Sequence, residues 1–185
     1  MIEVRFHGRG GQGAVIASEV LATAGFHEGY HVMAIPFFGV ERRGAPVTAF
    51  TRLSKEPILI RSGVYEPDFV VVLDESLLNA VDVLEGLKQA GAILVNTRRA
   101  PDELPIGKSV RAFTVDATEI AVKHGLGSPA IPIVNTAILG AFVKVSGLVS
   151  LNSVIEAVRA TVPSKKDANA AAAKEAFEQV RGRLA

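Results

Sequence analysis

Hydrophobic and polar positions along the first fifty residues switch between the two-residue period of strands and the broad apolar surface of a helix. Residues 2–7 are rich in β-branched and aromatic side chains and predict a strand. Residues 14–24, AVIASEVLATA, are apolar on nearly every side, which is typical of a helix buried among other elements. We expect a second strand over residues 31–35, ended by Pro36, and an alternating, half-exposed strand over residues 47–53.

The middle of the chain carries a continuous apolar run followed by a helix-like pattern. FVVVL at residues 69–73 is the pattern of a parallel strand that is covered on both faces. Asp74 and Glu75 then begin a helix predicted to reach about residue 90, with carboxylates at the positive end of its dipole. Shorter strands are expected at residues 57–60, 92–96 and 111–115.

The last third of the chain is predicted to be helical. Asp116 and Asn135 are expected to cap helices, the second over residues 136–145. Two further helices, at residues 151–162 and 167–183, are separated by Pro163.

The order of these elements indicates an α/β fold with a mostly parallel, Rossmann-like sheet, flanking helices and a helical C-terminal third. We expect residues 1–185 to form a single domain, with the antiparallel-looking segment near Val47 at an edge of the sheet.

Composition narrows the class of protein. The 185 residues are 49% hydrophobic and 21% charged, with a formal net charge of +1, which is typical of a packed globular chain. This balance gives no basic surface for nucleic acid or membrane lipid. The first residues show no signal pattern and no apolar run is long enough to span a bilayer, so we expect a cytoplasmic protein. The absence of cysteine excludes disulfides, zinc–thiolate sites and cysteine-ligated iron–sulfur clusters within this chain.

The most distinctive short motif is GRGGQG at residues 8–13, which fits G-x-G-x-x-G between a predicted strand and a predicted helix. Glycines there allow a tight turn and let the backbone and the helix N-terminus approach a phosphate. The candidate binding residues are Gly8, Gly10, Gly11, Gln12 and Gly13.

Two interpretations of this loop stay open. It binds a phosphate group, or its glycines serve only the packing of helix on sheet and a subunit interface. A nicotinamide cofactor is disfavoured, because the carboxylate expected about 20 residues further on to hold a ribose hydroxyl is missing from residues 33–37.

A second unusual loop, FFGVERRGAP at residues 37–46, combines two aromatic side chains with two arginines. Guanidinium groups bind phosphates and carboxylates in a bidentate manner. In a doubly wound sheet, the loops after the first two strands lie side by side where ligands bind. The candidate residues are Gly39, Glu41, Arg42, Arg43 and Gly44. The alternative interpretation is a solvated Glu–Arg pair beside a buried phenylalanine.

No self-sufficient catalytic set is present. His27 and His31 have helical spacing but straddle a predicted helix end, so no metal site is expected. Serine-hydrolase, Walker and zinc-protease motifs are missing from the sequence. We therefore predict neither a catalytic residue nor a metal in this chain, which favours a subunit of a larger enzyme.

Taken together, five segments resemble the gamma subunit, or the equivalent middle domain, of 2-oxoacid:ferredoxin oxidoreductases, in the same order and over nearly the whole chain. These segments are GRGGQGAV at residues 8–15, PFFGVERRGAPVTAFTR at 36–52, EPDFVVVLDESLL at 66–78, VDAT at 115–118 and IVNTAILGAF at 133–142. The second segment is most similar to the pyruvate and branched-chain (2-oxoisovalerate) enzymes.

This resemblance implies a role within a complex that also contains alpha, beta and delta subunits. Such enzymes convert pyruvate or a related 2-oxoacid by oxidative decarboxylation to an acyl-CoA and pass the electrons to ferredoxin. Thiamine diphosphate and iron–sulfur clusters would lie on the partner subunits, and coenzyme A would bind at the complex rather than to this chain alone. The isolated chain would be inactive, and its bare apolar interface could pair with a second copy.

By the same resemblance, the two loops form the functional edge, and Arg42 and Arg43 are expected to contact the phosphates of coenzyme A. One competing interpretation is a stand-alone nucleotide-binding dehydrogenase domain. Another is a structural subunit whose loops serve assembly and touch no ligand.

Overall fold

The computed structural model describes residues 1–37, 44–128 and 130–183. Its centre is a seven-stranded sheet with the strand order β2-β3-β1-β4-β5-β6-β9. The strands are β1 (Ile2–Arg9), β2 (His31–Phe37), β3 (Pro46–Ser54), β4 (Phe69–Val72), β5 (Ala92–Asn96), β6 (Arg111–Val115) and β9 (Arg181–Arg183). The neighbouring strands β1, β4, β5 and β6 are parallel. β2 points the same way, and β3 and β9 run against them, so the predicted mostly parallel sheet is confirmed.

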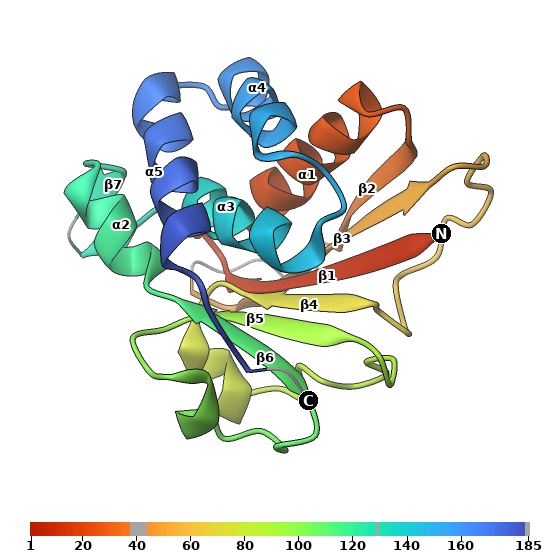
Figure 1. The fold of residues 1–185 in the computed structure, drawn as a ribbon, viewed down its shortest axis with the longest axis horizontal. Helices are drawn as coiled ribbons and strands as arrows, with labels where there is room; N and C mark the ends of the chain where they lie inside the picture. The colour runs from red at the N-terminus through yellow and green to blue at the C-terminus, as the bar shows by residue number, and fades with distance from the viewer. Residues whose placement is uncertain (38–43, 129, 184–185) are drawn as a thin grey trace.

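Helices cover one face of this sheet (Figure 1). They are α1 (Ala14–His27), α3 (Asn135–Ser146), α4 (Leu151–Thr161) and α5 (Lys166–Gln179), with the shorter α2 (Ala117–Lys123) and the hairpin β7 (Gly127–Ser128) and β8 (Ile131–Pro132) beside them. The main hydrophobic core lies between these helices and the inner side chains of β1 and β4, such as Phe6 and Val71. Phe142 of α3 joins the layers, because its ring meets Phe69 edge-on at 5.5 Å.

The opposite face of β4, β5 and β6 is covered by loops and short 3₁₀ turns. A second hydrophobic cluster forms there around Val70, Val72 and Ile93, whose side chains alternate with those of the first cluster. The long helix predicted after Asp74 is wrong: only residues Glu75–Asn79 form a 3₁₀ helix. Its leucines, Leu77, Leu78, Leu84 and Leu87, pack in the second cluster, whereas Val81 is exposed, and Gly86 has a φ of 69° in the turn that follows.

Three strand predictions need correction. β2 continues through Pro36, because an edge strand tolerates a residue without an N–H. The strand near Val47 is not at the edge, since β3 lies between β2 and β1. Residues 57–60 form no strand. The Arg52 contacts described below hold the end of this segment and the residues after it.

Two helix predictions also differ from the structure. The last helix ends at Gln179, and β9 follows it antiparallel to β6, where Gly182 lies so close to the ring of Phe113 that a Cβ would be 2.5 Å away. Asp116 caps α2 as predicted by accepting the N–H of Glu119. Asn135 is the first residue of α3 rather than its cap, although its side chain accepts the N–H of Thr136.

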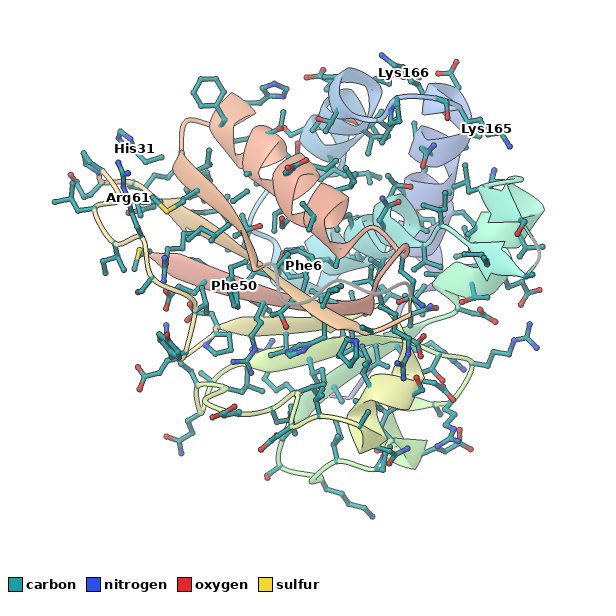
Figure 2. The ribbon with its side chains drawn as sticks, turned by 180° about the vertical axis from the view of Figure 1, so that it is seen from behind. Phe6, His31, Phe50, Arg61, Lys165 and Lys166 are labelled. Carbon is teal, nitrogen blue, oxygen red and sulfur yellow. The ribbon has the colours of Figure 1, made fainter. Side chains whose placement is uncertain are left out.

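A fully buried arginine holds the loop between β3 and β4. The guanidinium of Arg52 is 2% exposed and pairs with the carboxylate of Glu3 at 2.8 Å. It also donates hydrogen bonds to the backbone carbonyls of residues 60, 62 and 63. The loop that follows β3 therefore has a charged group as its core. Figure 2 shows this side of the molecule from behind, with Phe50 over the strands and Arg61 in the loop.

A buried histidine lies on the same face of β1. His7 accepts a hydrogen bond from the Nε of Arg5 at 3.1 Å, and Arg5 also donates to the carbonyls of Val83 and Glu85. Burial, followed by the neighbouring positive charge of Arg5, lowers the pKa of His7 to about 4. His7 is therefore neutral at neutral pH and faces away from the helices that cover the sheet.

Replacing Arg52 by methionine should lower the free energy of unfolding by about 3–5 kcal/mol, because the carbonyls and the Glu3 carboxylate lose a buried partner. Urea denaturation measures this loss. The matched control is Arg61→Met in the exposed part of the same loop, which should change stability by less than about 0.5 kcal/mol. Equal stabilities of the two variants would contradict the role of Arg52.

The free energy of unfolding should also fall as the pH falls, over a pH window set by His7. The folded pKa of about 4 lies below the unfolded value of about 6.5, so protons bind the unfolded state first as the pH falls from 6.5 towards 4. The cost over that window is about 3 kcal/mol. His7→Gln should abolish this part of the pH dependence, whereas His27→Gln at the exposed end of α1 should keep it. Parallel slopes for His7→Gln and the wild type in pH-resolved urea melts would refute the assignment.

Candidate functional site

The carboxyl ends of the parallel strands meet at one edge of the sheet, which is where ligands bind in folds of this kind. The glycine loop follows β1 there, Asp74 follows β4, and Thr97 follows β5. Gly8 and Arg9 still belong to β1, so the turn itself begins at Gly10. The loop predicted from GRGGQG is therefore at the predicted place.

Gly13 has two structural reasons to be glycine. Its φ of 84° is in the left-handed region, and a Cβ there would lie 2.4 Å from the Nδ2 of Asn135. The absent side chain thus lets the starts of α1 and α3 meet. Gly13 is the N-cap of α1 and offers no side-chain cap, and the first turn of α1 contains no acidic residue. The first N–H groups of α1 remain available to an anion.

Gln12 ties the glycine loop to the end of β4. Its Oε1 accepts the backbone N–H of Arg9 at 2.8 Å, and its Nε2 donates to Asp74 at 2.8 Å. Asp74 also accepts hydrogen bonds from the N–H and hydroxyl of Ser76. Partial burial by itself raises the pKa of Asp74, but the hydrogen bonds from Ser76 and Gln12 and the charge of Arg9 outweigh it and leave the pKa below its ordinary value.

Arg9 joins three loops at this edge. Its guanidinium donates to the carbonyl of Gly44 at 3.0 Å and to the hydroxyl of Ser76 at 2.7 Å, and its Nε lies 3.4 Å from Asp74. These contacts occupy the guanidinium within the protein. Arg9 is therefore a positioning residue for the loops. Sequence reasoning did not single it out, although its place inside the GRGGQG motif could have pointed to it.

The end of the second loop lies against the glycine loop. Gly44 donates its N–H to the carbonyl of Gly10, and Gly10 donates its N–H to the carbonyl of Ala45. The expectation that the two loops are neighbours is confirmed at this point. The other candidates of the second loop, Gly39, Glu41, Arg42 and Arg43, lie outside the described residues.

A cavity of about 460 Å³ opens between the glycine loop and the ends of β4, β5 and β6. Asn96 is buried behind it and donates to the carbonyl of Leu73 and the hydroxyl of Thr118, so its amide is fixed. The mouth carries Arg98, which pairs with Asp116 at 2.8 Å and is 79% exposed. Sequence reasoning missed Asn96 and Arg98, although Asn96 ends the parallel strand β5 and Arg98 follows it, a position from which both could have been found.

The groups around the cavity are suited to binding a polar ligand. The cavity offers amide, hydroxyl, carboxylate and guanidinium groups, and the hydroxyl of Thr97 in its lining donates to the carboxylate of Glu75. Within residues 1–37, 44–128 and 130–183, no group of three or more His, Cys, Asp or Glu side chains could hold a metal ion. In the same part of the chain, no helix has the length and apolar character needed to cross a membrane.

Comparison with known proteins identifies the family. The family model described as pyruvate ferredoxin/flavodoxin oxidoreductase matches residues 3–179. The chain is 55% identical to the pyruvate/ketoisovalerate oxidoreductases common subunit gamma of Pyrococcus furiosus, over 97% of both chains. It is 53% identical to the pyruvate synthase subunit PorC of Methanothermobacter marburgensis, over 98% of both chains.

Solved structures agree. The crystal structure of the pyruvate oxidoreductase subunit PORC from Thermotoga maritima matches with a TM-score of 0.83 at 37% identity, over 98% of this chain and 97% of that one. A 2-oxoglutarate:ferredoxin oxidoreductase from Magnetococcus marinus shares the fold, with a TM-score of 0.68 at 22% identity, and the match covers 96% of this chain but 30% of that one. The fold thus exists both as a separate subunit and as part of a longer chain. By sequence and by fold, this chain belongs to the pyruvate ferredoxin/flavodoxin oxidoreductase family, as a gamma-type subunit of a multisubunit oxidoreductase.

Proposed function

We propose that the chain forms one wall of the coenzyme A site in the assembled enzyme, which oxidises pyruvate or a related 2-oxoacid to an acyl-CoA. One observation carries this proposal: the glycine loop, with the open N-terminus of α1, is hydrogen-bonded to the base of the arginine-bearing second loop at Gly44. Two structures that favour anions are thereby held together at the ligand edge of the sheet.

The division of labour follows from the side chains. Backbone N–H groups of the glycine loop and the start of α1 bind a phosphate, and Arg42 and Arg43 bind a second one. Arg9 does not join them, because Gly44, Ser76 and Asp74 already occupy its guanidinium. The chain therefore orients the coenzyme and leaves the reaction to its partners. The Magnetococcus marinus protein that shares the fold is described with 2-oxoglutarate, coenzyme A and succinyl-CoA bound.

The partners in this proposal are alpha, beta and delta subunits. Thiamine diphosphate and the iron–sulfur clusters belong to those chains, in agreement with a sequence that has no cysteine. The whole chain acts as one domain, which is supported by a sheet whose strands run from Ile2 to Arg183. The complex works in the cytoplasm. A homodimer of the isolated chain has no support in the described residues.

A stand-alone dehydrogenase is the weaker alternative. No carboxylate occurs in residues 31–37 of β2, where a ribose-binding acid would be expected. The relatives named above are subunits rather than complete dehydrogenases.

Purification of the tagged chain from its native cell under mild conditions should recover thiamine-binding and cysteine-rich partners, because a gamma-type subunit works inside a complex. Mass spectrometry identifies the partners, and coenzyme A-dependent oxidation of pyruvate, 2-oxoisovalerate and 2-oxoglutarate names the substrate. Recovery of the chain alone, under conditions that keep other complexes intact, would contradict the proposed assembly.

The double variant Arg42→Ala, Arg43→Ala should raise the KM for coenzyme A in the assembled enzyme by about tenfold or more, because two charge-assisted contacts to phosphate are lost. The kcat at saturating coenzyme A and the KM for the 2-oxoacid should change little. Steady-state kinetics on the purified complex measures all three values.

The matched control is Arg61→Ala, which removes an exposed arginine between β3 and β4, at the opposite edge of the sheet. Size-exclusion chromatography checks assembly of each variant. An unchanged KM for coenzyme A in a fully assembled double variant would overturn the proposed contact, and loss of assembly alone would favour the purely structural role.

A further inference from the structure

A second cavity of about 460 Å³ lies on the helical side of the glycine loop. It is bounded by the starts of α1, α3 and α5, by the β7–β8 hairpin and by the loop between α4 and α5. Five apolar side chains line it: Ile16, Leu126, Ile133, Val162 and Pro163. The function proposed above uses none of these five residues. A cavity of this size and composition is in the range that accommodates a small organic ligand.

Two long helices begin at this cavity without side-chain caps. Gly13 precedes α1 and Lys165 precedes α5, and both N-cap residues have left-handed backbone angles and make no capping hydrogen bond. The first N–H groups of both helices therefore carry partial positive charge at the cavity.

The entry to α5 carries two lysines where the helix dipole disfavours positive charge, but only Lys165 lines the cavity. Lys165 and Lys166 directly precede the helix and open it (Figure 2). Asp167 supplies the acidic residue of the first turn, but its carboxylate is paired with Arg159 at 3.0 Å. Among the described residues, no carboxylate pairs with the ammonium of Lys165. It donates a hydrogen bond to the carbonyl of Gly125.

A buried amide points to what the cavity lacks. Asn135 is 5% exposed and lines the cavity, and its Oδ1 accepts the N–H of Thr136. Its Nδ2 lies over the Cα of Gly13, at the cavity wall, and has no acceptor among the described residues. A ligand oxygen at this place would give the Nδ2 an acceptor inside the cavity.

The backbone of Lys165 is held in place by a series of hydrogen bonds between buried polar side chains. The hydroxyl of Thr136 donates to the Oδ1 of Asn169, and the Nδ2 of Asn169 donates to the carbonyls of Ser164 and Lys165. Thr136 and Asn169 are both buried. Lys165 therefore keeps a fixed backbone position at the cavity, with two of its three ammonium N–H groups available beyond the bond to Gly125.

We propose that this cavity binds an organic phosphate that carries an apolar arm. The phosphate lies between the ammonium of Lys165, the Nδ2 of Asn135 and the N–H groups at the start of α5, and leaves the start of α1 to the site proposed above. The arm lies against Ile16, Val162 and the other apolar side chains. This site does not depend on Arg42 and Arg43. Coenzyme A and a free phosphorylated metabolite share the required chemistry.

The test compares Lys165→Gly with wild type in calorimetric titrations of the complete chain with inorganic pyrophosphate and, separately, with coenzyme A. Glycine prefers the φ of 49° that Lys165 adopts, so this variant removes the ammonium and leaves the turn intact. The dissociation constant of pyrophosphate should rise about tenfold, as expected for the loss of a charge-assisted contact. The urea midpoint of the variant should stay at the wild-type value.

Lys166→Ala is the matched control, because it removes the neighbouring exposed charge from a residue that does not line the cavity. It should keep wild-type affinity. Tighter binding of coenzyme A than of pyrophosphate, lost in Lys165→Gly, identifies the coenzyme as the source. Equal or weaker binding of coenzyme A, with pyrophosphate still dependent on Lys165, identifies a free phosphorylated metabolite.

Equal affinities of wild type and Lys165→Gly for both probes, or no binding of either probe to wild type, overturn the site. Titration of the double variant Arg42→Ala, Arg43→Ala with the same two probes separates the cavity site from the proposed function. A loss confined to that double variant refutes the Lys165 site and leaves the second loop as the anion contact. A loss of affinity confined to Lys165→Gly supports the cavity site and refutes the proposed phosphate contact of the second loop.

Discussion

The close approach at Gly13 is the constraint on which the ligand edge depends. Its positive φ turns the chain from β1 into α1, and its missing Cβ leaves room for Asn135 at the start of α3. Because glycine has no side chain to cap the helix, the first N–H groups of α1 have no side-chain cap. A larger residue at this position would both strain the backbone and separate the helices.

The loops around this point form one connected unit. Gln12 reaches from the glycine loop to Asp74, and Arg9 reaches to Gly44 and Ser76. Charged and amide side chains in this motif are thus used to fix backbone, and the backbone is what faces the ligand edge. In the proposed function, the glycines and the helix N-terminus would supply the anion affinity, and no ribose carboxylate would be needed.

The opposite face of β1 and β3 shows a different use of charge. Arg52 is buried to organise a loop that has no regular secondary structure, and His7 is kept neutral by burial and by Arg5. These side chains lie away from the helical layer: Arg52 bonds Glu3 and backbone carbonyls, and the ring of His7 bonds Arg5.

The sequence by itself determined the α/β class, most strands, the long helices and the place of the glycine loop, because hydrophobic period and glycine chemistry are local properties. It also indicated the family through five ordered segments. Local pattern failed after Asn79: Leu84 and Leu87 pack in the second cluster without forming a helix, Val81 is exposed, and Gly86 has a positive φ.

Only the tertiary structure decided which strand is at the edge, how Arg9 and Gln12 are used, and which residues line the two cavities. β3 lies inside the sheet because it pairs with both β1 and β2, and Pro36 is tolerated because β2 is at the edge. Asn96, Asn135 and Lys165 come from distant parts of the chain, and their environments depend on long-range packing. A sequence pattern records which faces are apolar, whereas the partners of a polar atom depend on where the whole chain has folded.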